Sequence, residues 1–162
     1  MVINWQPDNN RAINVEWHRA PYRISTDPAA IDTARVARFL QHESYWGQDI
    51  TLARIERSLQ HSLCFCLMEN ESMVGFARVI TDYAVFGYLE DVFVDDALRG
   101  RGLGKWLMQC VLDHPDVGGL KKLMLATADA QGLYRQYGFN EVKNPEMVME
   151  RYNYTDFPDA PR

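Results

Sequence analysis

The chain of 162 residues alternates between two kinds of apolar pattern. Short runs rich in β-branched, aromatic and other apolar residues, bounded by turn residues, predict strands. Stretches in which apolar residues recur every three or four positions predict helices. The expected strands cover residues 22–25, 63–68, 73–80, 88–94 and 120–126, with a last pair at 139–142 and 147–152. The expected helices cover residues 27–40, 50–60, 102–113 and 130–137.

Local signals at the element ends support these assignments. Asp27 precedes Pro28, which is the combination expected of a helix N-cap and a first helical position. Pro115 follows the third helix, whose apolar stripe is expected to lie in the core. An antiparallel meander followed by alternating helices and strands predicts an α/β fold, in which a mixed sheet carries helices on both faces.

Size and composition fit a single domain. The chain is 47% hydrophobic and 24% charged, which suffices for one core and makes a second domain unexpected. We expect an N-terminal extension over residues 1–20, with an added strand near residues 13–17. A single domain over residues 21–155 and a tail over residues 156–162 would follow it.

Charge, cysteines and the N-terminus narrow the function classes. The net charge of −5, with scattered Lys and Arg, argues against nucleic-acid binding and mildly favours cationic ligands. The chain has no signal-peptide core and no apolar run near the roughly 20 residues of a membrane span, so we expect a cytoplasmic protein without a membrane partner. Cys64, Cys66 and Cys110 are expected to be reduced core residues, and neither they nor the histidines show the spacing of a metal site.

The segment RGRGLG, residues 99–104, carries the clearest chemical signal. It lies between an apolar strand region and an amphipathic helix, so its backbone N–H groups and the positive helix end converge on one point, as in an anion site. A P-loop is excluded because Trp106 follows Lys105 where Ser or Thr is required. A Rossmann fingerprint is not expected at mid-chain after a meander. A glycine-rich turn with solvated arginines stays open as an alternative.

Three motifs in order resemble one family. Arg99, Gly102 and Gly104 match the Q/R-x-x-G-x-G/A signature of the GNAT superfamily of N-acetyltransferases. The stretch YLEDVFVDDALRGRGLG is similar to the corresponding strand, loop and helix of spermidine/spermine-type acetyltransferases. LYRQYGF, residues 133–139, resembles the L-Y-x-x-x-G-F motif of the family. The resemblance covers residues 22–152 and implies a mostly antiparallel mixed sheet of about seven strands.

The resemblance implies acetyl-CoA as the co-substrate. The backbone around Val92, Phe93 and Val94 would bind the pantetheine chain and polarise the acetyl carbonyl. Thr127 stands where the family often has an Asn that contacts the pantetheine, which puts that contact in doubt. The residues implied for the pyrophosphate are Arg99, Gly100, Arg101, Gly102, Leu103, Gly104 and Lys105.

Two residues are candidates for the proton transfers that acyl transfer to an amine requires. By the resemblance Glu90 is the general base, acting through water, and Tyr134 is the general acid near the thioester sulfur. Neighbouring strand residues point to opposite faces, so only one of Glu90 and Asp91 is expected to face an acceptor pocket. A structural role for Glu90 or Asp91, and a packing role for Tyr134, stay open; Tyr137 is expected to be structural.

The acceptor side is expected between the first two helices. Tyr45 and Trp46 are candidates for a wall against the substrate, with an aromatic plug over the core as the alternative. Arg78 would bind a substrate carboxylate, or else pair with Asp82 or Glu90, and Asp91 completes the candidate substrate-binding set. The leading hypothesis is acetylation of a primary amine on a small molecule. Protein lysine or N-terminal acetylation, or a non-catalytic CoA sensor, are the alternatives, and a homodimer is an expected partner because dimers are common for such folds.

Overall fold

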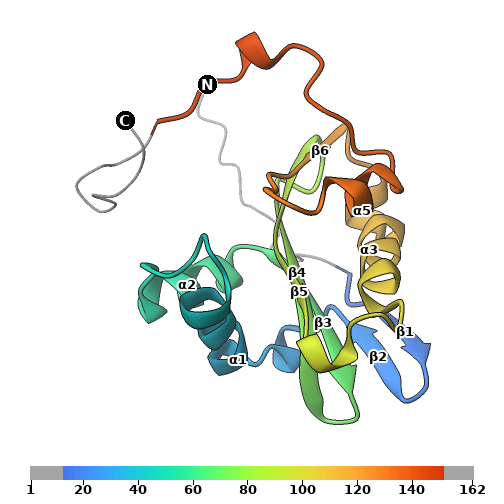
Figure 1. Cartoon of the computed structure of the whole chain (residues 1–162). Helices are drawn as coiled ribbons and strands as arrows, with labels where there is room; N and C mark the ends of the chain where they lie inside the picture. Colours follow the sequence, from blue (N-terminus) through green and yellow to red (C-terminus); the bar gives the residue numbers. More distant parts are fainter. Residues whose placement is uncertain (1–12, 152–162) are drawn as a thin grey trace, which may run out of the picture.

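The computed structural model describes residues 13–151, which form a six-stranded sheet flanked by helices (Figure 1). The strands are β1 (Glu16–Arg19), β2 (Tyr22–Ser25), β3 (Leu63–Glu69), β4 (Ser72–Thr81), β5 (Phe86–Val94) and β6 (Lys122–Met124). The α-helices are α1 (Thr33–Arg38), α2 (Leu52–Gln60), α3 (Leu103–Asp113), α4 (Pro115–Gly118) and α5 (Gln131–Arg135). Short η elements lie at Pro28–Ala30, Phe39–Glu43, Asp96–Leu98 and Pro145–Met147, numbered η1 to η4.

The strands lie in the sheet in the order in which they occur in the chain. Pairs from β1 to β5 are antiparallel, and the single parallel pair joins β5 to β6. The expected mixed, mostly antiparallel α/β sheet is therefore confirmed, with six strands close to the predicted seven. A strand in the N-terminal extension also forms, as β1 against β2, although residues 1–12 lie outside the described part.

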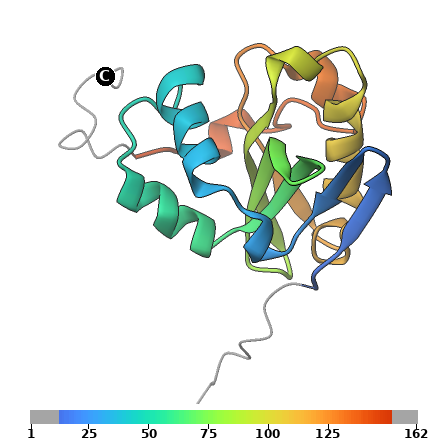
Figure 2. The ribbon, with the colours of Figure 1, turned by 90° about the horizontal axis from the view of Figure 1, so that it is seen from below.

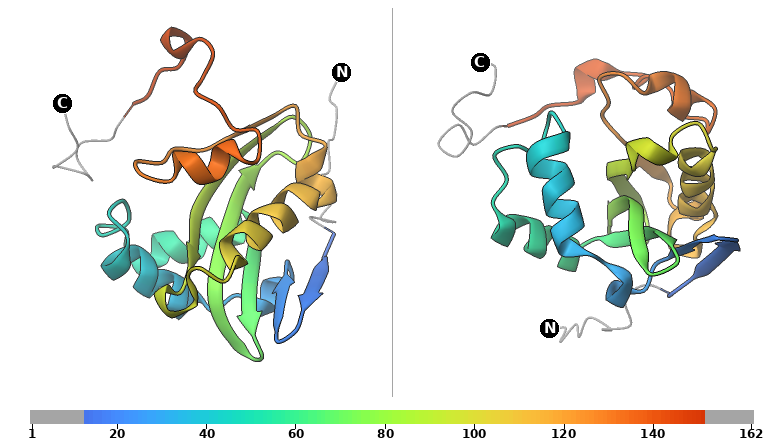
Figure 3. Two further views of the ribbon diagram at one scale, coloured as in Figure 1. Left: turned by 45° about the vertical axis from the view of Figure 1, so that its right-hand side comes forward. Right: turned by 60° about the horizontal axis from the view of Figure 1, so that its bottom comes forward.

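Helices cover both faces of the sheet, as expected. The helices α1 and α2 lie on one side and α3 on the other, which is clearest when the molecule is seen from below (Figure 2) and in the right-hand view of Figure 3. Each face has its own core: α3 contributes Leu107 and Val111 to one, and the opposite core contains Phe76 and Phe93 beneath α1 and α2. The sheet is thus buried on both faces near its centre.

The first helix differs from its prediction. Instead of one helix over residues 27–40, Asp27 caps only the short turn η1 and a second aspartate, Asp32, caps α1 by accepting from the backbone N–H of Arg35. The sequence therefore holds two competing N-caps five residues apart, and each begins its own element. After α1 the chain widens into η2, a π-helix at Phe39–Glu43.

The expected last strand pair does not form in the described residues. Residues 139–151 contain only η4, where Asn144 and Pro145 accept from the backbone N–H groups of Met147 and Val148. Proline has no backbone N–H for a ladder and favours a turn at this point. Residue 152, at the end of the expected second strand, lies outside the described part.

The cysteine prediction is confirmed: Cys64, Cys66 and Cys110 are free and buried. Among residues 13–151 no helix is long and apolar enough to cross a membrane. The same part of the chain brings together no group of three or more His, Cys, Asp or Glu side chains that could hold a metal ion.

Candidate active site

A β-bulge in β5 shapes the centre of the site. The pairing of β4 with β5 runs from Gly75 opposite Val94 to Phe76 opposite Phe93, then shifts so that Arg78 lies opposite Glu90. One residue of β4 therefore opposes two of β5, and Asp91 takes up the extra position with φ of 53°. A bulge of this kind interrupts the strict alternation of side chains along a strand.

The bulge places Glu90 and Asp91 on the same face of the sheet. The guanidinium of Arg78 bonds to both, with Nε donating to the Asp91 carboxylate and Nη2 donating to that of Glu90. The prediction that these two carboxylates point to opposite faces is therefore wrong, because it assumed a regular strand. Both lie on the α1 and α2 side, which is also the side of Phe93.

Arg78 is buried and all its donor nitrogens face polar partners. Its third nitrogen, Nη1, donates to Ser62 Oγ over 3.2 Å. The predicted pairing with Glu90 is present, whereas the alternative with Asp82 is wrong: Asp82 instead accepts from backbone N–H groups of its own turn. With two carboxylates around one guanidinium, the Arg78 cluster (Arg78, Glu90, Asp91) carries a formal charge of −1 when both acids are ionised.

The two carboxylates of this cluster differ in environment. Burial raises the pKa of the Glu90 carboxyl, Arg78 partly offsets that rise, and the Asp91 carboxylate adds to it. Asp91 is the more buried of the two and also accepts a hydrogen bond from Trp46 Nε1 over 3.2 Å. Glu90 is thus the more accessible group, with a raised affinity for a proton.

An aromatic wall (Tyr45, Trp46) stands beside the cluster. The two rings meet edge to face with centroids 4.7 Å apart, and Trp46 also contacts Phe39 of η2 at 5.8 Å. Tyr45 is 60% exposed and Trp46 is 45% exposed. The hydroxyl of Tyr45 accepts from the backbone N–H of Ala128, 83 residues away, so the wall reaches the loop after β6.

Tyr134 lies on α5, next to the end of β6. Its ring is buried and packs edge to face against Phe139, and it lines a cavity of about 790 Å³ together with Thr127. Burial raises the pKa of the Tyr134 hydroxyl, with Asp129 and Tyr45 adding to the rise, so the group stays protonated at neutral pH. Tyr137, by contrast, donates its hydroxyl to the carbonyl of Lys105 and so has a structural contact.

The glycine-rich loop has the geometry of an anion site. Gly100 and Gly102 have φ of 78° and 77°, and no atom lies within 4 Å of where a Cβ would stand on either. Gly102 is the N-cap of α3 but offers no side chain to cap the first N–H groups of the helix, so these point outward unpaired. Arg99 pairs with Asp96 at 2.7 Å, and Arg101 donates to the hydroxyl of Tyr22 at 3.3 Å.

Within the described residues, one edge of β5 lacks a strand partner over most of its length. Pairing with β6 extends only over Phe86–Tyr88, and beyond Tyr88 that edge has no strand partner among residues 13–151. The side chain of Phe93 is occupied in the core on the α1 side, whereas Val92 and Val94 are partly buried on the other face. The backbone N–H and C=O groups along this edge of β5 therefore lack strand partners in the described part of the chain. Thr127 accepts from the backbone N–H of Ala130 at 3.0 Å, which leaves its hydroxyl hydrogen free to donate.

The structure gathers the sequence-predicted side chains into three groups, one of which is Thr127 and Tyr134 at the cavity beside β6. Tyr45, Trp46, Arg78, Glu90 and Asp91 meet on the α1 and α2 side of β5, and residues 99–105 lie at the α3 N-terminus. Sequence reasoning missed Ser62, for which the chain offers no signal. The pairing of both Glu90 and Asp91 with Arg78 did have a sequence signal: Arg78 is a lone arginine inside the apolar run of the neighbouring predicted strand.

Fold and site together define an α/β protein with a glycine-rich helix start after one end of β5 and two carboxylates at the middle of that strand. The acetyltransferase (GNAT) family model matches residues 15–139. A candidate acetyltransferase of Gibberella zeae is 30% identical over 139 residues, covering 73% of this chain and 78% of the relative. The chain therefore belongs to the acetyltransferase (GNAT) family, whose members use acetyl-CoA as co-substrate.

Solved structures agree with this assignment. A GNAT-family protein from Xanthomonas campestris pv. campestris shares 47% identity with a TM-score of 0.79, over 81% of this chain and 92% of that one. An acetyltransferase structure from Clostridium acetobutylicum that contains acetyl-CoA has a TM-score of 0.59 at 15% identity, over 83% of this chain and 96% of that one. The second likeness is one of fold alone.

Proposed function

We propose that the protein transfers the acetyl group of acetyl-CoA to a primary amine on a small molecule. The observation that carries this proposal is the Arg78 cluster, where a bulge brings Glu90 and Asp91 to one face beside the exposed aromatic wall. A net negative site next to aromatic rings favours a cationic acceptor such as an alkylammonium ion.

The donor would be held mainly by backbone groups. The open glycines and the uncapped first turn of α3 fit a pyrophosphate, because peptide N–H groups can approach it closely without obstruction by side chains. Arg99, Arg101 and Lys105 would add charge at the rim. The unpaired edge of β5 at Val92–Val94 would donate to the pantetheine chain and the acetyl carbonyl, and Thr127 would contact the same chain from the loop after β6.

Glu90 and Tyr134 would carry the proton transfers. Bound acetyl-CoA supplies an acetyl group activated as a thioester. Glu90, with its raised pKa, would accept a proton from the ammonium through water and so free the nitrogen lone pair for attack. As the C–N bond forms and the C–S bond breaks, Tyr134, protonated at neutral pH, would donate its proton to the departing thiolate and regain a proton from the second N–H that the attacking nitrogen loses. Backbone N–H groups of β5 would stabilise the oxyanion between these steps.

On the acceptor side, Arg78 would act as a counter-ion rather than as a substrate ligand. Its nitrogens are taken by Asp91, Glu90 and Ser62, so a substrate carboxylate would have to displace one of them. Asp91 and Trp46 would hold the geometry of the pocket, and Tyr45 would face the carbon chain of the amine. This arrangement favours amines without a carboxylate next to the reacting nitrogen.

The test is to incubate the protein with acetyl-CoA and, in turn, polyamines, amino acids, aminoglycosides and a lysine peptide. Turnover is measured as the release of free thiol. We expect turnover with at least one small amine and none with the peptide. Turnover of the peptide alone would favour protein acetylation. Binding of acetyl-CoA without turnover of any amine would favour a CoA sensor.

A further inference from the structure

A second buried arginine, Arg35, lies outside the Arg78 cluster and connects η2 with the segment that follows β5. Arg35 of α1 is 8% exposed, and its Nη1 and Nη2 donate to the two carboxylate oxygens of Glu43 over 3.2 Å each. Nη2 also donates to the carboxylate of Asp95, and the guanidinium lies over the ring of Phe93 at 4.6 Å. One side chain of α1 thus holds a carboxylate of η2 and a carboxylate at the end of β5.

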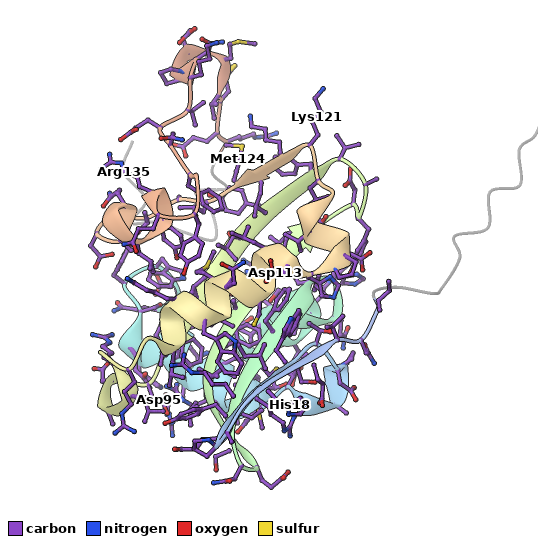
Figure 4. The ribbon with its side chains drawn as sticks, turned by 90° about the vertical axis from the view of Figure 1, so that its right-hand side faces the viewer. His18, Asp95, Asp113, Lys121, Met124 and Arg135 are labelled. Atoms are coloured by element: carbon purple, nitrogen blue, oxygen red, sulfur yellow. The ribbon has the colours of Figure 1, made fainter. Side chains whose placement is uncertain are left out.

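Each of these two carboxylates leads directly into one side of the site. Glu43 is the last residue of η2 and stands two positions before Tyr45, where the aromatic wall begins. Asp95 follows β5 and precedes η3, after which the glycine-rich loop begins at Arg99. Figure 4 shows Asp95 beside the loop that enters α3, at the opposite end of that helix from Asp113.

The contacts around Arg35 make these two segments depend on each other. The backbone N–H of Asp95 donates to Val74 at 2.8 Å, which fixes this residue to the sheet. Phe39, the first residue of η2, stacks on Phe93 with ring centroids 4.1 Å apart. A π-helix is rare and is frequently found at functional sites. Nη2 of Arg35 is shared between Glu43 and Asp95, so the loss of either carboxylate removes a charge-assisted hydrogen bond from the buried guanidinium. The stability of η2 and that of the start of the loop are therefore coupled.

We propose that Arg35 is a positioning residue that couples ligand binding at the glycine-rich loop to the ordering of the aromatic wall. This inference rests on the proposed binding of acetyl-CoA at residues 99–105. A ligand that fixes the loop restricts the segment that precedes it and so holds the side chain of Asp95 on Arg35. Arg35 in turn holds Glu43, and with it Tyr45 and Trp46. By linkage, an acceptor that orders the wall increases the affinity for the donor by the same factor.

The test is amide hydrogen exchange of the full chain with and without saturating coenzyme A, which requires no knowledge of the acceptor. The reporters are the N–H groups of Ser44, bonded to the Phe39 carbonyl, and of Gly47, bonded to Ser44 Oγ. In the unmodified protein coenzyme A should slow exchange at residues 99–105 and, through Arg35, at Ser44 and Gly47 by about 5- to 10-fold, within the usual range of coupling between sites.

Asp95→Asn is the decisive variant, because Asp95 is 31% exposed at its side chain and its loss leaves Arg35 paired with Glu43. Coenzyme A should still protect residues 99–105 in this variant but should change exchange at Ser44 and Gly47 less than twofold. Arg38→Lys is the matched control: Arg38 also contacts Glu43, at 3.5 Å, but is 63% exposed and does not contact Asp95, so coupling should persist.

Two results would overturn the proposal. One is protection of residues 99–105 without protection of Ser44 and Gly47 in the unmodified protein, and the other is undiminished coupling in Asp95→Asn. A purely structural role for Arg35 predicts faster exchange in the variant to the same extent with and without coenzyme A. Absence of any protection at residues 99–105 would overturn both this inference and the proposed function.

Discussion

The proposed donor side and the proposed acceptor side of this site, called the donor side and the acceptor side below, are built from different parts of the polypeptide. The donor side consists of main chain: two glycines with positive φ, the uncapped start of α3 and an unpaired strand edge. The acceptor side consists of side chains from β4, β5 and the segment between α1 and α2, held by ion pairs and ring contacts. A main-chain site fits a ligand that does not vary, whereas side chains can change the accepted amine without altering the fold.

This difference predicts that substitutions on the two sides separate kinetically. Changes on the acceptor side should alter turnover while leaving the affinity for acetyl-CoA unchanged. Changes in the loop should do the reverse. A substitution that moved both quantities equally would break the comparison.

The largest expected effect is that of Glu90→Gln. The amide keeps the size of the side chain but cannot accept the proton of the ammonium, so kcat/KM for the amine should fall by about 10³- to 10⁴-fold, near the upper range for general acid–base catalysis. The dissociation constant of acetyl-CoA, measured by calorimetry, should not change. A fall in thermal stability with unchanged kcat/KM would assign Glu90 to local structure instead.

The same group sets the expected pH dependence. A base acts when deprotonated, so kcat/KM should decrease as the pH falls through the pKa of Glu90, and that pKa is raised by burial. Asp91→Asn removes a negative charge beside Glu90, and Glu90 then becomes the only carboxylate that Arg78 neutralises. Both changes lower the pKa of Glu90. The acid limb of the profile should therefore move to lower pH in this variant. A limb that moved to higher pH would contradict Glu90 as the titrating base.

Tyr134→Phe should have the next largest effect, of about 10²- to 10³-fold on kcat. It is expected to be smaller than that of Glu90→Gln because water can replace the tyrosine as proton donor to a thiolate. Tyr137→Phe is the matched control, since it also removes one hydroxyl from the same segment but breaks only the bond to the Lys105 carbonyl. Equal rates for both variants in single-turnover measurements would return Tyr134 to a packing role.

On the donor side, Gly102→Ala should weaken acetyl-CoA binding with little change in kcat at saturation. The space around Gly102 is open, so the cost is the strain of a left-handed alanine, about 1–2 kcal/mol. If the free loop relieves this strain and the bound loop restores it, the dissociation constant rises by up to roughly 5- to 30-fold. Gly132→Ala tests the specificity of the effect, because Gly132 lies in α5 with open space and without a positive φ. A similar loss of affinity in both variants would count against the loop as the site.

The same division explains what could be predicted from the sequence. The loop was recognised because glycine spacing and the start of a helix are local properties, and α3 begins at Leu103 directly after the glycine that caps it. That Glu90 and Asp91 share a face could not be predicted, because a bulge depends on the register of β5 against β4. Similarly, periodicity over residues 27–40 predicted a continuous helix, but the local hydrogen bond of Asp32 begins a second element.

The smallest expected effect is that of Trp46→Phe, which tests whether the bond from Trp46 to Asp91 contributes to the different roles of Asp91 and Glu90. Trp46→Phe keeps an aromatic ring in the wall but removes the Nε1 donor to Asp91. A hydrogen bond to a charged group contributes about 1.5–3 kcal/mol, but Trp46 is 45% exposed, so water can replace much of it and a loss of about 2- to 10-fold in kcat/KM is expected. The dissociation constant of acetyl-CoA should stay the same. Because Asp91 keeps its bond to Arg78, the acid limb of the pH profile should shift less than in Asp91→Asn; an equal shift would mean that Trp46, and not Arg78, controls the charge beside Glu90.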